Sequence, residues 1–193
     1  MFKQVLVAVD GSPTSNRGLK AAIGLAADQH ASLAIVHVVD TMASMAYVGD
    51  MSYVPASYVD DMLEDLRVSG RRILAKAEGT ARDAGVEAKT LLVETKGGTV
   101  AEAILGQARK AHADVIVLGT HGRRGLSRVL MGSDAETVLR EARVPVMLVR
   151  APEAAARSGA LKSTRTRAKR AARKATTGAA AASGTRTRET SQS

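Results

Sequence analysis

The sequence of 193 residues contains no cysteine and no tryptophan. The lack of cysteine excludes a disulfide framework, a thiolate metal site and a cysteine nucleophile. Aromatic residues make up only 2% of the chain against 45% for all hydrophobic residues, so the core must be aliphatic. No apolar run approaches the roughly 20 residues that cross a bilayer, and the one near Met1 is too short for a signal peptide. We therefore expect a soluble, cytoplasmic protein with no membrane partner.

Acidic residues are scarce in the last part of the chain. Residues 153–193 hold ten Lys and Arg against two acidic residues, a net charge of +8, whereas residues 1–152 hold 18 basic and 17 acidic residues, a net charge of +1. The last part is also rich in Ala, Thr, Ser and Gly, and such a composition cannot bury enough surface to offset the entropy of ordering. The sequence therefore predicts one folded domain at 1–152 and a disordered basic tail at 153–193.

Short apolar runs and helical patterns alternate along residues 1–152. The runs are rich in β-branched residues and predict buried strands, while the segments between them repeat apolar residues at helical spacing. Expected helix ends include Ser12 or Thr14 as an N-cap, a capping box from Thr99 to Glu102, and Gly85 as a C-cap. The alternation predicts an α/β fold with a mainly parallel sheet and helices on both faces. The expected strands are 4–9, 32–39, 87–94, 114–119 and 145–150, and the expected helices are 14–29, 58–84, 99–111 and 133–142.

A glycine-rich segment follows the fourth expected strand. Glycines let the backbone turn sharply and approach a ligand without a Cβ in the way. At Gly132-Ser133 the segment opens a helix, whose unpaired N–H groups and positive dipole end favour an anion. This arrangement predicts a phosphate-binding loop. Its glycines are Gly119, Gly122, Gly125 and Gly132, and the side chains that add donors or positive charge are His121, Arg123, Arg124 and Arg128.

The spacing of the glycines in this segment distinguishes it from other phosphate-binding loops. Neither the GxxxxGK[ST] loop nor the dinucleotide GxGxxG pattern is present. The pattern G-x2-G-x9-G-[ST], however, is complete as Gly119, Gly122, Gly132 and Ser133. It resembles the ATP-binding signature of the universal stress protein family, and the flanking segments VDGS, HVV and PVMLVR match that family too. The resemblance covers residues 1–151.

The resemblance implies a fold, a ligand and a set of contacts. The fold is a Rossmann-like open five-stranded parallel sheet of strand order 3-2-1-4-5. The implied ligand is ATP, with Mg or Mn held through the phosphates, and the implied assembly is a homodimer that pairs the fifth strands, Val146–Arg150. Carried over by position, Asp10 would accept hydrogen bonds from the ribose, and Ala8, Val9 and Val38 would lie against the adenine. The expected triphosphate residues are Gly119, His121, Gly122, Arg123, Gly132 and Ser133.

Several of these residues allow a second interpretation. Asp10 stands in the run Asp10-Gly11-Ser12-Pro13, where it could cap a helix or form an Asx turn, and both roles can coexist with ribose binding. For His37 we expect a backbone contact ahead of a ligand contact. Asp134 complements the helix dipole at the first turn, but pointed into the site it would repel phosphate unless it reached a metal. Asp134 therefore leaves open whether the ligand is ATP, AMP or another nucleotide. The Met- and Tyr-containing segment 42–58 is either a flap or a packing surface.

The sequence shows no catalytic constellation. ATP hydrolysis needs a residue that orients the attacking water and groups that stabilise charge at the γ-phosphate. The sequence identifies no pair of residues that would do this together. Slow hydrolysis or autophosphorylation stays open. We therefore expect an ATP-binding, nucleotide-dependent regulator in the stress response. The alternative, from a different class, is a nucleic-acid-associated protein that holds DNA or RNA through basic residues 157–188 of the tail.

Overall fold

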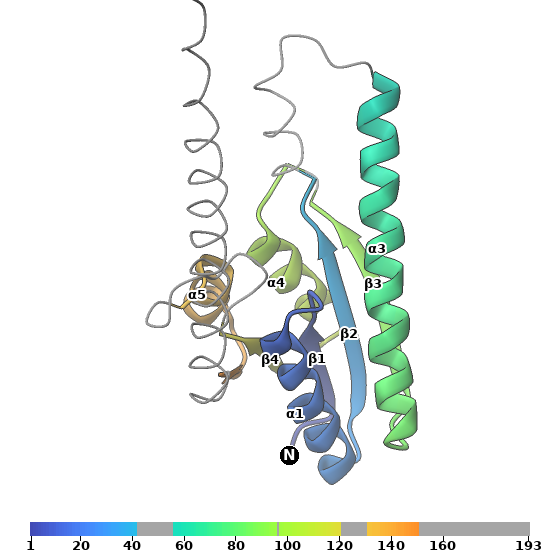
Figure 1. Cartoon of the computed structure of the whole chain (residues 1–193). Coiled ribbons are helices and arrows are strands. Elements are labelled where there is room, and N and C mark those ends of the chain that lie inside the picture. The colour runs from blue at the N-terminus through green and yellow to red at the C-terminus, as the bar shows by residue number, and fades with distance from the viewer. Residues whose placement is uncertain (42–55, 96, 121–130, 151–193) are drawn as a thin grey trace, which may run out of the picture. The chain divides into compact units, whose positions relative to one another are not determined.

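The computed structural model describes residues 1–41, 56–95, 97–120 and 131–150, and helices and strands alternate along them (Figure 1). Each predicted element is present, with its ends within two residues of the prediction. The segment 42–55, His121 to Leu130 and the tail from Ala151 lie outside the described residues. In chain order the elements are β1 (Gln4–Ala8), α1 (Pro13–Gln29), β2 (Ser32–Val39), α3 (Ala56–Asp83), β3 (Ala88–Glu94), α4 (Val100–Lys110), β4 (Val115–Gly119), α5 (Ser133–Glu141) and β5 (Val146–Val149).

The strands form one parallel sheet in the order β3-β2-β1-β4-β5, which confirms the expected topology. β1 lies at the centre and pairs with β2 on one side and β4 on the other; Val7, for example, lies between Ile35 and Val117. The chain therefore winds outward in both directions from β1. The winding reverses between β1 and β4, and in open sheets of this kind ligands bind at that point, beyond the carboxyl ends of the strands.

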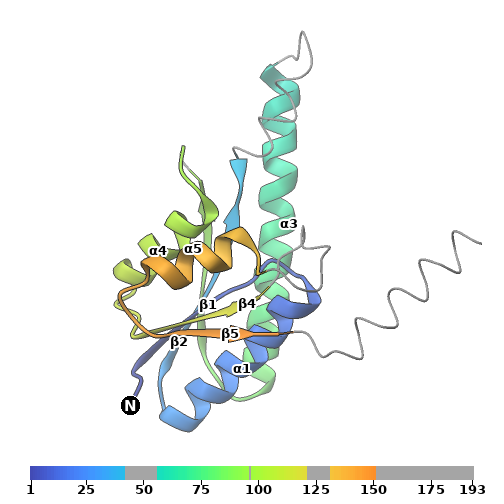
Figure 2. The same cartoon turned by 90° about the vertical axis from the view of Figure 1, so that its left-hand side faces the viewer.

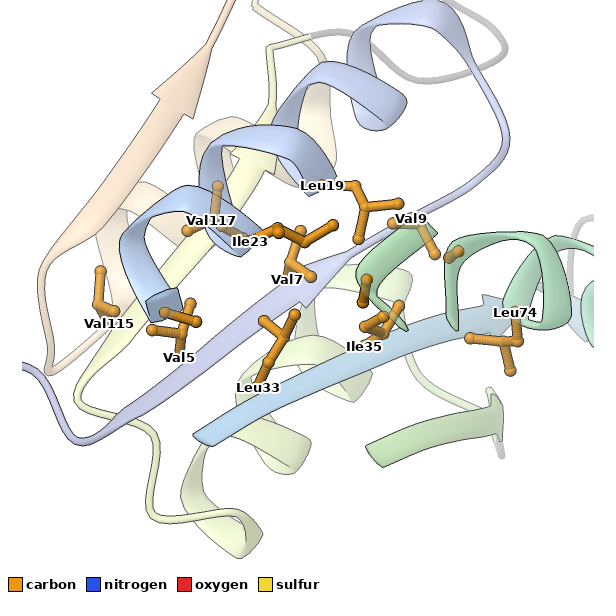
Figure 3. Packing of buried hydrophobic residues seen from close by; sticks show 14 residues of the cluster. Val5, Val7, Val9, Leu19, Ile23, Leu33, Ile35, Leu74, Val115 and Val117 are labelled. Carbon is orange, nitrogen blue, oxygen red and sulfur yellow. The ribbon is translucent and has the colours of Figure 1, made fainter. Parts of the chain in front are cut away.

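Two aliphatic clusters sandwich the sheet. Alternate residues of each strand point to opposite faces, so Val5 and Val7 pack under α1 and α3, whereas Leu6 packs under α4 and α5. Figure 2 shows α4 and α5 on one side of the sheet and α1 on the other. Figure 3 shows the first cluster closely, with Leu19 and Ile23 of α1 beside Val7 of the central strand. The expectation of an aliphatic core covered by helices on both faces is confirmed.

Helix ends follow the capping residues of the sequence. Ser12, not Thr14, is the N-cap of α1, because its hydroxyl accepts the Ser15 N–H at 3.1 Å. Thr99 and Glu102 form a reciprocal capping box at the start of α4. Gly85, at φ +75°, follows α3 in the left-handed conformation that glycine adopts without strain. Because α1 follows β1 and α4 follows β3 in a parallel sheet, the N-termini of both helices lie at its carboxyl edge.

The 28-residue helix α3 is tied to the edge strand β3. Arg67 donates to Glu94 of β3 through Nε at 2.8 Å and Nη2 at 3.1 Å. These hydrogen bonds are the main reason why the pKa of Arg67 lies above its usual value. Glu64, one turn earlier, bonds Arg71, and this holds the pKa of Glu64 below its usual value. None of the helices in the described ranges combines the length and the apolar composition that a membrane crossing requires.

Gly70 of α3 sits where a side chain would collide with β2 and β3. A Cβ built at this position would lie 2.6 Å from Cδ1 of Leu92 and 2.7 Å from Cδ2 of His37. We expect Gly70→Ala to lower the free energy of unfolding by about 1–2 kcal/mol, because overpacking outweighs the gain of about 1 kcal/mol in helix propensity. Urea denaturation measures the change.

Gly79 of the same helix is the matched control, since its nearest atom to a built Cβ is the end of Arg82 at 4.0 Å. Gly79→Ala is expected to raise stability by about 0.5–1 kcal/mol through propensity alone. If the two alanine variants changed stability equally, the close approach of α3 to His37 would be contradicted.

Candidate functional site

The candidate site lies at the carboxyl edge of the sheet, where β1 and β4 end side by side. The Val9 N–H still donates to the Val36 carbonyl at 2.9 Å, so the chain leaves the sheet only at Asp10. On the other strand, the Thr120 N–H donates to the Val149 carbonyl at 3.0 Å, and the described chain stops there. Because β1 and β4 are parallel neighbours, the segments that follow them begin at one edge of the sheet.

Asp10 begins a tight turn into α1. Its Oδ1 accepts the Ser12 N–H at 2.9 Å, which makes the Asx turn that the sequence allowed. Gly11, at φ +80°, supplies the left-handed backbone between them. A carboxylate has about four acceptor sites, so this bond is compatible with accepting ribose hydroxyls as well. Asp10 is only partly buried and stands at the end of the central strand.

The Ser15 hydroxyl fixes the same turn from inside α1. It accepts the Asp10 N–H at 3.3 Å and donates to the Ser12 carbonyl at 3.1 Å. Ser12 and Ser15 are both buried, at 8% and 4% exposure, so these bonds are shielded from water. The sequence reading recognised Ser12 as a cap but missed Ser15. A serine in the first turn of a helix, three residues after another serine, was the available signal.

Gly119 allows α1 to approach the end of β4. A Cβ built on Gly119 would lie 3.0 Å from the Thr14 carbonyl carbon and 3.0 Å from the Ser15 nitrogen. Gly18, one turn further along α1, faces the same point, and its built Cβ would lie 3.5 Å from the Gly119 nitrogen. The sequence predicted Gly119 as a phosphate residue. The structure shows that Gly119 lies in close contact with the first turn of α1, whereas its role toward phosphate stays a prediction.

The start of α5 returns to the end of β4. The Gly132 N–H donates to the Thr120 carbonyl at 2.9 Å, so the residues on either side of 121–130 lie together. Gly132 is the N-cap of α5 and provides no side-chain cap, while Ser133 and Asp134 are exposed at its first turn. Helix α5 therefore begins at the same edge as Asp10. The predicted residues His121, Gly122 and Arg123 lie outside the described residues.

The residues expected near the adenine divide between the two faces of the sheet. Val9 is buried at 4% exposure in the cluster under α1 and α3. Ala8 and Val38 are partly buried and pack against the cluster under α4 and α5. His37 lies on the α3 side of the sheet, and its Nδ1 is 2.7 Å from the Val9 carbonyl oxygen. The expected backbone contact of His37 is therefore present.

A cavity of about 1000 Å³ opens at the opposite, amino-terminal edge of the sheet, far from the predicted residues. Its lining mixes acidic and basic side chains, among them Glu78, Arg82 and Lys110, and this mixture selects no ligand class. The carboxyl edge carries the strand reversal, Gly119 and Gly132, and the N-termini of α1, α4 and α5. The candidate site is therefore the carboxyl edge.

Comparisons with known proteins agree on one family. The model of the universal stress protein family matches residues 1–150. Universal stress protein YxiE of Bacillus subtilis is 34% identical over 151 residues, which cover 78% of this chain and all of YxiE. A universal stress protein from Burkholderia pseudomallei of known crystal structure is 37% identical, with a TM-score of 0.61, and the match covers 77% of this chain and 96% of that one.

A third relative was solved with a ligand. The crystal structure of a universal stress protein in complex with cAMP matches with 25% identity and a TM-score of 0.56, over 77% of this chain and 97% of that one. The sequence signature, the sheet order and these matches over the same residues agree, and the chain belongs to the universal stress protein family.

Proposed function

We propose that this chain binds ATP at the carboxyl edge of β1 and β4 and acts as a nucleotide-dependent regulator in the stress response. The observation that carries the proposal is the placement of Asp10, at the end of the central strand, on the same sheet edge as the Gly132 start of α5. A carboxylate there is suited to a ribose diol, and a helix N-terminus is suited to phosphate. The relative solved with cAMP supports an adenine nucleotide as the ligand class.

The phosphate end of the proposed site is built on backbone groups. Helix α5 starts at Gly132 without a side-chain cap, so its first N–H groups suit an anion. Gly122, His121 and Arg123 complete the proposed phosphate contacts from outside the described residues. Mg or Mn would be held through the phosphates, and Asp134, exposed in the first turn of α5, would take part if its carboxylate reached that metal. In that role Asp134 favours a metal-bound triphosphate over a free one.

Asp10→Asn tests the ribose contact. Asparagine keeps an oxygen for the Ser12 N–H but loses the charge, and hydrogen bonds to charged groups exceed neutral ones by about 1 kcal/mol or more. We expect ATP with Mg to bind the wild-type chain in isothermal titration calorimetry, and Asp10→Asn to weaken that binding by about tenfold or more. Native mass spectrometry of the purified chain checks for nucleotide that co-purifies.

Asp28→Asn is the matched control, because Asp28 is an exposed carboxylate near the opposite end of α1. It should leave ATP affinity within about twofold, which corresponds to less than 0.5 kcal/mol. The proposal is wrong if the wild-type chain neither carries nucleotide nor binds ATP. Equal losses in both variants would contradict the ribose role of Asp10.

Two further roles are proposed beside nucleotide binding. The chain forms a homodimer by pairing of Val146–Arg150; β5 is an edge of the sheet, and Met147 on it is 38% exposed.

The second candidate function is nucleic-acid binding through residues 157–188. Its support is the charge of +8 on residues 153–193 beside a nearly neutral domain. Charge of this kind releases counterions from a phosphate backbone without reading sequence.

A further inference from the structure

The peptide group between Val9 and Asp10 is fixed on both sides by side chains. Its carbonyl oxygen lies 2.7 Å from Nδ1 of His37. Its N–H donates to the Ser15 hydroxyl at 3.3 Å. The preceding N–H, that of Val9, still belongs to the sheet ladder. At the Val9–Asp10 peptide, hydrogen bonds to the side chains of His37 and Ser15 therefore replace the backbone hydrogen bonds of the sheet.

His37 must be the donor in its contact with Val9. A carbonyl oxygen only accepts hydrogen bonds, so the proton of the imidazole stands on Nδ1. The ring is buried, with the residue at 7% exposure. Water is therefore a poor substitute for this donor, and the carbonyl orientation depends on the ring.

Helix α3 holds the ring in place from the other side. The Cβ position of Gly70 would lie 2.7 Å from Cδ2 and 3.2 Å from Nε2 of His37, so the helix backbone lies directly against the imidazole. Ile73, one turn along α3, similarly lies 3.4 Å from the Cβ position of Gly11. The helix thus contacts both the donor ring and the turn that follows Asp10.

We infer that His37 is a positioning residue for nucleoside binding: through the Val9 carbonyl it orients the Val9–Asp10 peptide, and so presents the Asp10 carboxylate to the ribose hydroxyls. This inference rests on the proposed function, because it assigns a role within the same site. His37 touches the protein backbone and not the ligand. Its effect is therefore expected at the nucleoside, chiefly at the ribose contact of Asp10, and not at the phosphates.

The test compares ATP with 2′,3′-dideoxy-ATP, which lacks the hydroxyls that Asp10 would bind. Calorimetric titrations with Mg use the full chain as wild type, His37→Leu and His37→Asn. Wild type is expected to bind ATP about tenfold or more tightly than the dideoxy analogue, as fits hydrogen bonds to a charged acceptor. His37→Leu should lose about tenfold for ATP and less than twofold for the analogue, so that the preference disappears. His37→Asn carries an amide nitrogen near the place of Nδ1 and should restore the preference.

A purely structural role of His37 predicts a different pattern. Equal losses for ATP and the dideoxy analogue in His37→Leu would overturn the inference, as would an unchanged preference. If wild type showed no preference, the ribose role of Asp10 would fall and the inference with it. Failure of wild type to bind either nucleotide is a separate result, which overturns the proposed function itself. Should His37→Leu not fold, Ser15→Ala removes the bond on the other side of the same peptide and should give the same selective loss.

Discussion

Gly119→Ala is expected to lower the free energy of unfolding by about 2–3 kcal/mol and to weaken nucleotide binding by about a hundredfold. The built Cβ would lie 3.0 Å from two backbone atoms of α1, which cannot rotate away as a flexible side chain could. Gly119 does not have a positive φ, so the penalty is steric and not conformational. To make room, the first turn of α1 must move, and with it Ser12 and Ser15, which hold the turn at Asp10. Urea denaturation and ATP calorimetry measure the two losses.

Gly18→Ala is the matched control from the other side of the same contact. Its built Cβ would lie 3.5 Å from the Gly119 nitrogen and from the Leu118 carbonyl carbon, an ordinary packing distance. Within helix α1, alanine should also gain up to about 1 kcal/mol in propensity. Gly18→Ala is therefore expected to be neutral or stabilising and to keep ATP binding. Similar losses of stability and of ATP affinity in both variants would show that the contact between α1 and β4 accepts no added methyl group on either side. That result would contradict the distances of the two built Cβ atoms.

Residues 1–120 show why much of this fold could be predicted from sequence. The run 32–39 is apolar except for Ser32 and His37, and the structure confirms it to the residue as β2. Thr99 and Glu102 act within one turn of helix, so their capping box depends on no distant residue. β1 is one residue shorter than predicted, because beyond Val9 the peptide bonds to His37 and Ser15 instead of a neighbouring strand. Local patterns predict local structure well.

The contacts that hold the candidate site could not be predicted in the same way. Gly18 and Gly70 both interrupt helical patterns, and nothing beside them in the sequence says which strand they approach. Their partners, Gly119 and His37, lie 101 and 33 residues away along the chain. Such partners follow from how the helices cross the sheet, which is a property of the whole fold. The roles of Asp10, Val38 and Gly132 toward a ligand remain predictions.

The second large effect concerns the tail. We expect the wild-type chain to bind DNA without sequence preference, with an affinity that falls steeply between 50 and 200 mM salt. A protein that makes about 6–10 phosphate contacts loses about 10³–10⁵ in affinity over that range. Replacing the ten Lys and Arg of residues 153–193 by Gln removes those contacts while leaving residues 1–152 unchanged. The affinity for DNA at 50 mM salt should fall by about a thousandfold. The slope of the logarithm of that affinity against the logarithm of the salt concentration should approach zero. Fluorescence anisotropy with a labelled duplex measures both.

A charge-conserving variant separates charge from other properties of the tail. Changing Lys162, Lys169 and Lys174 to Arg keeps the net charge of the tail at +8. Because counterion release depends on the number of charges, this variant should bind DNA within about twofold of wild type. ATP affinity should be unchanged in both variants, since the candidate site lies wholly within residues 1–152. If the neutralised chain kept its affinity and its salt slope, the tail would not be the nucleic-acid contact. If ATP affinity fell together with DNA binding, the tail would take part in the nucleotide site, and the two proposed functions would not be separable.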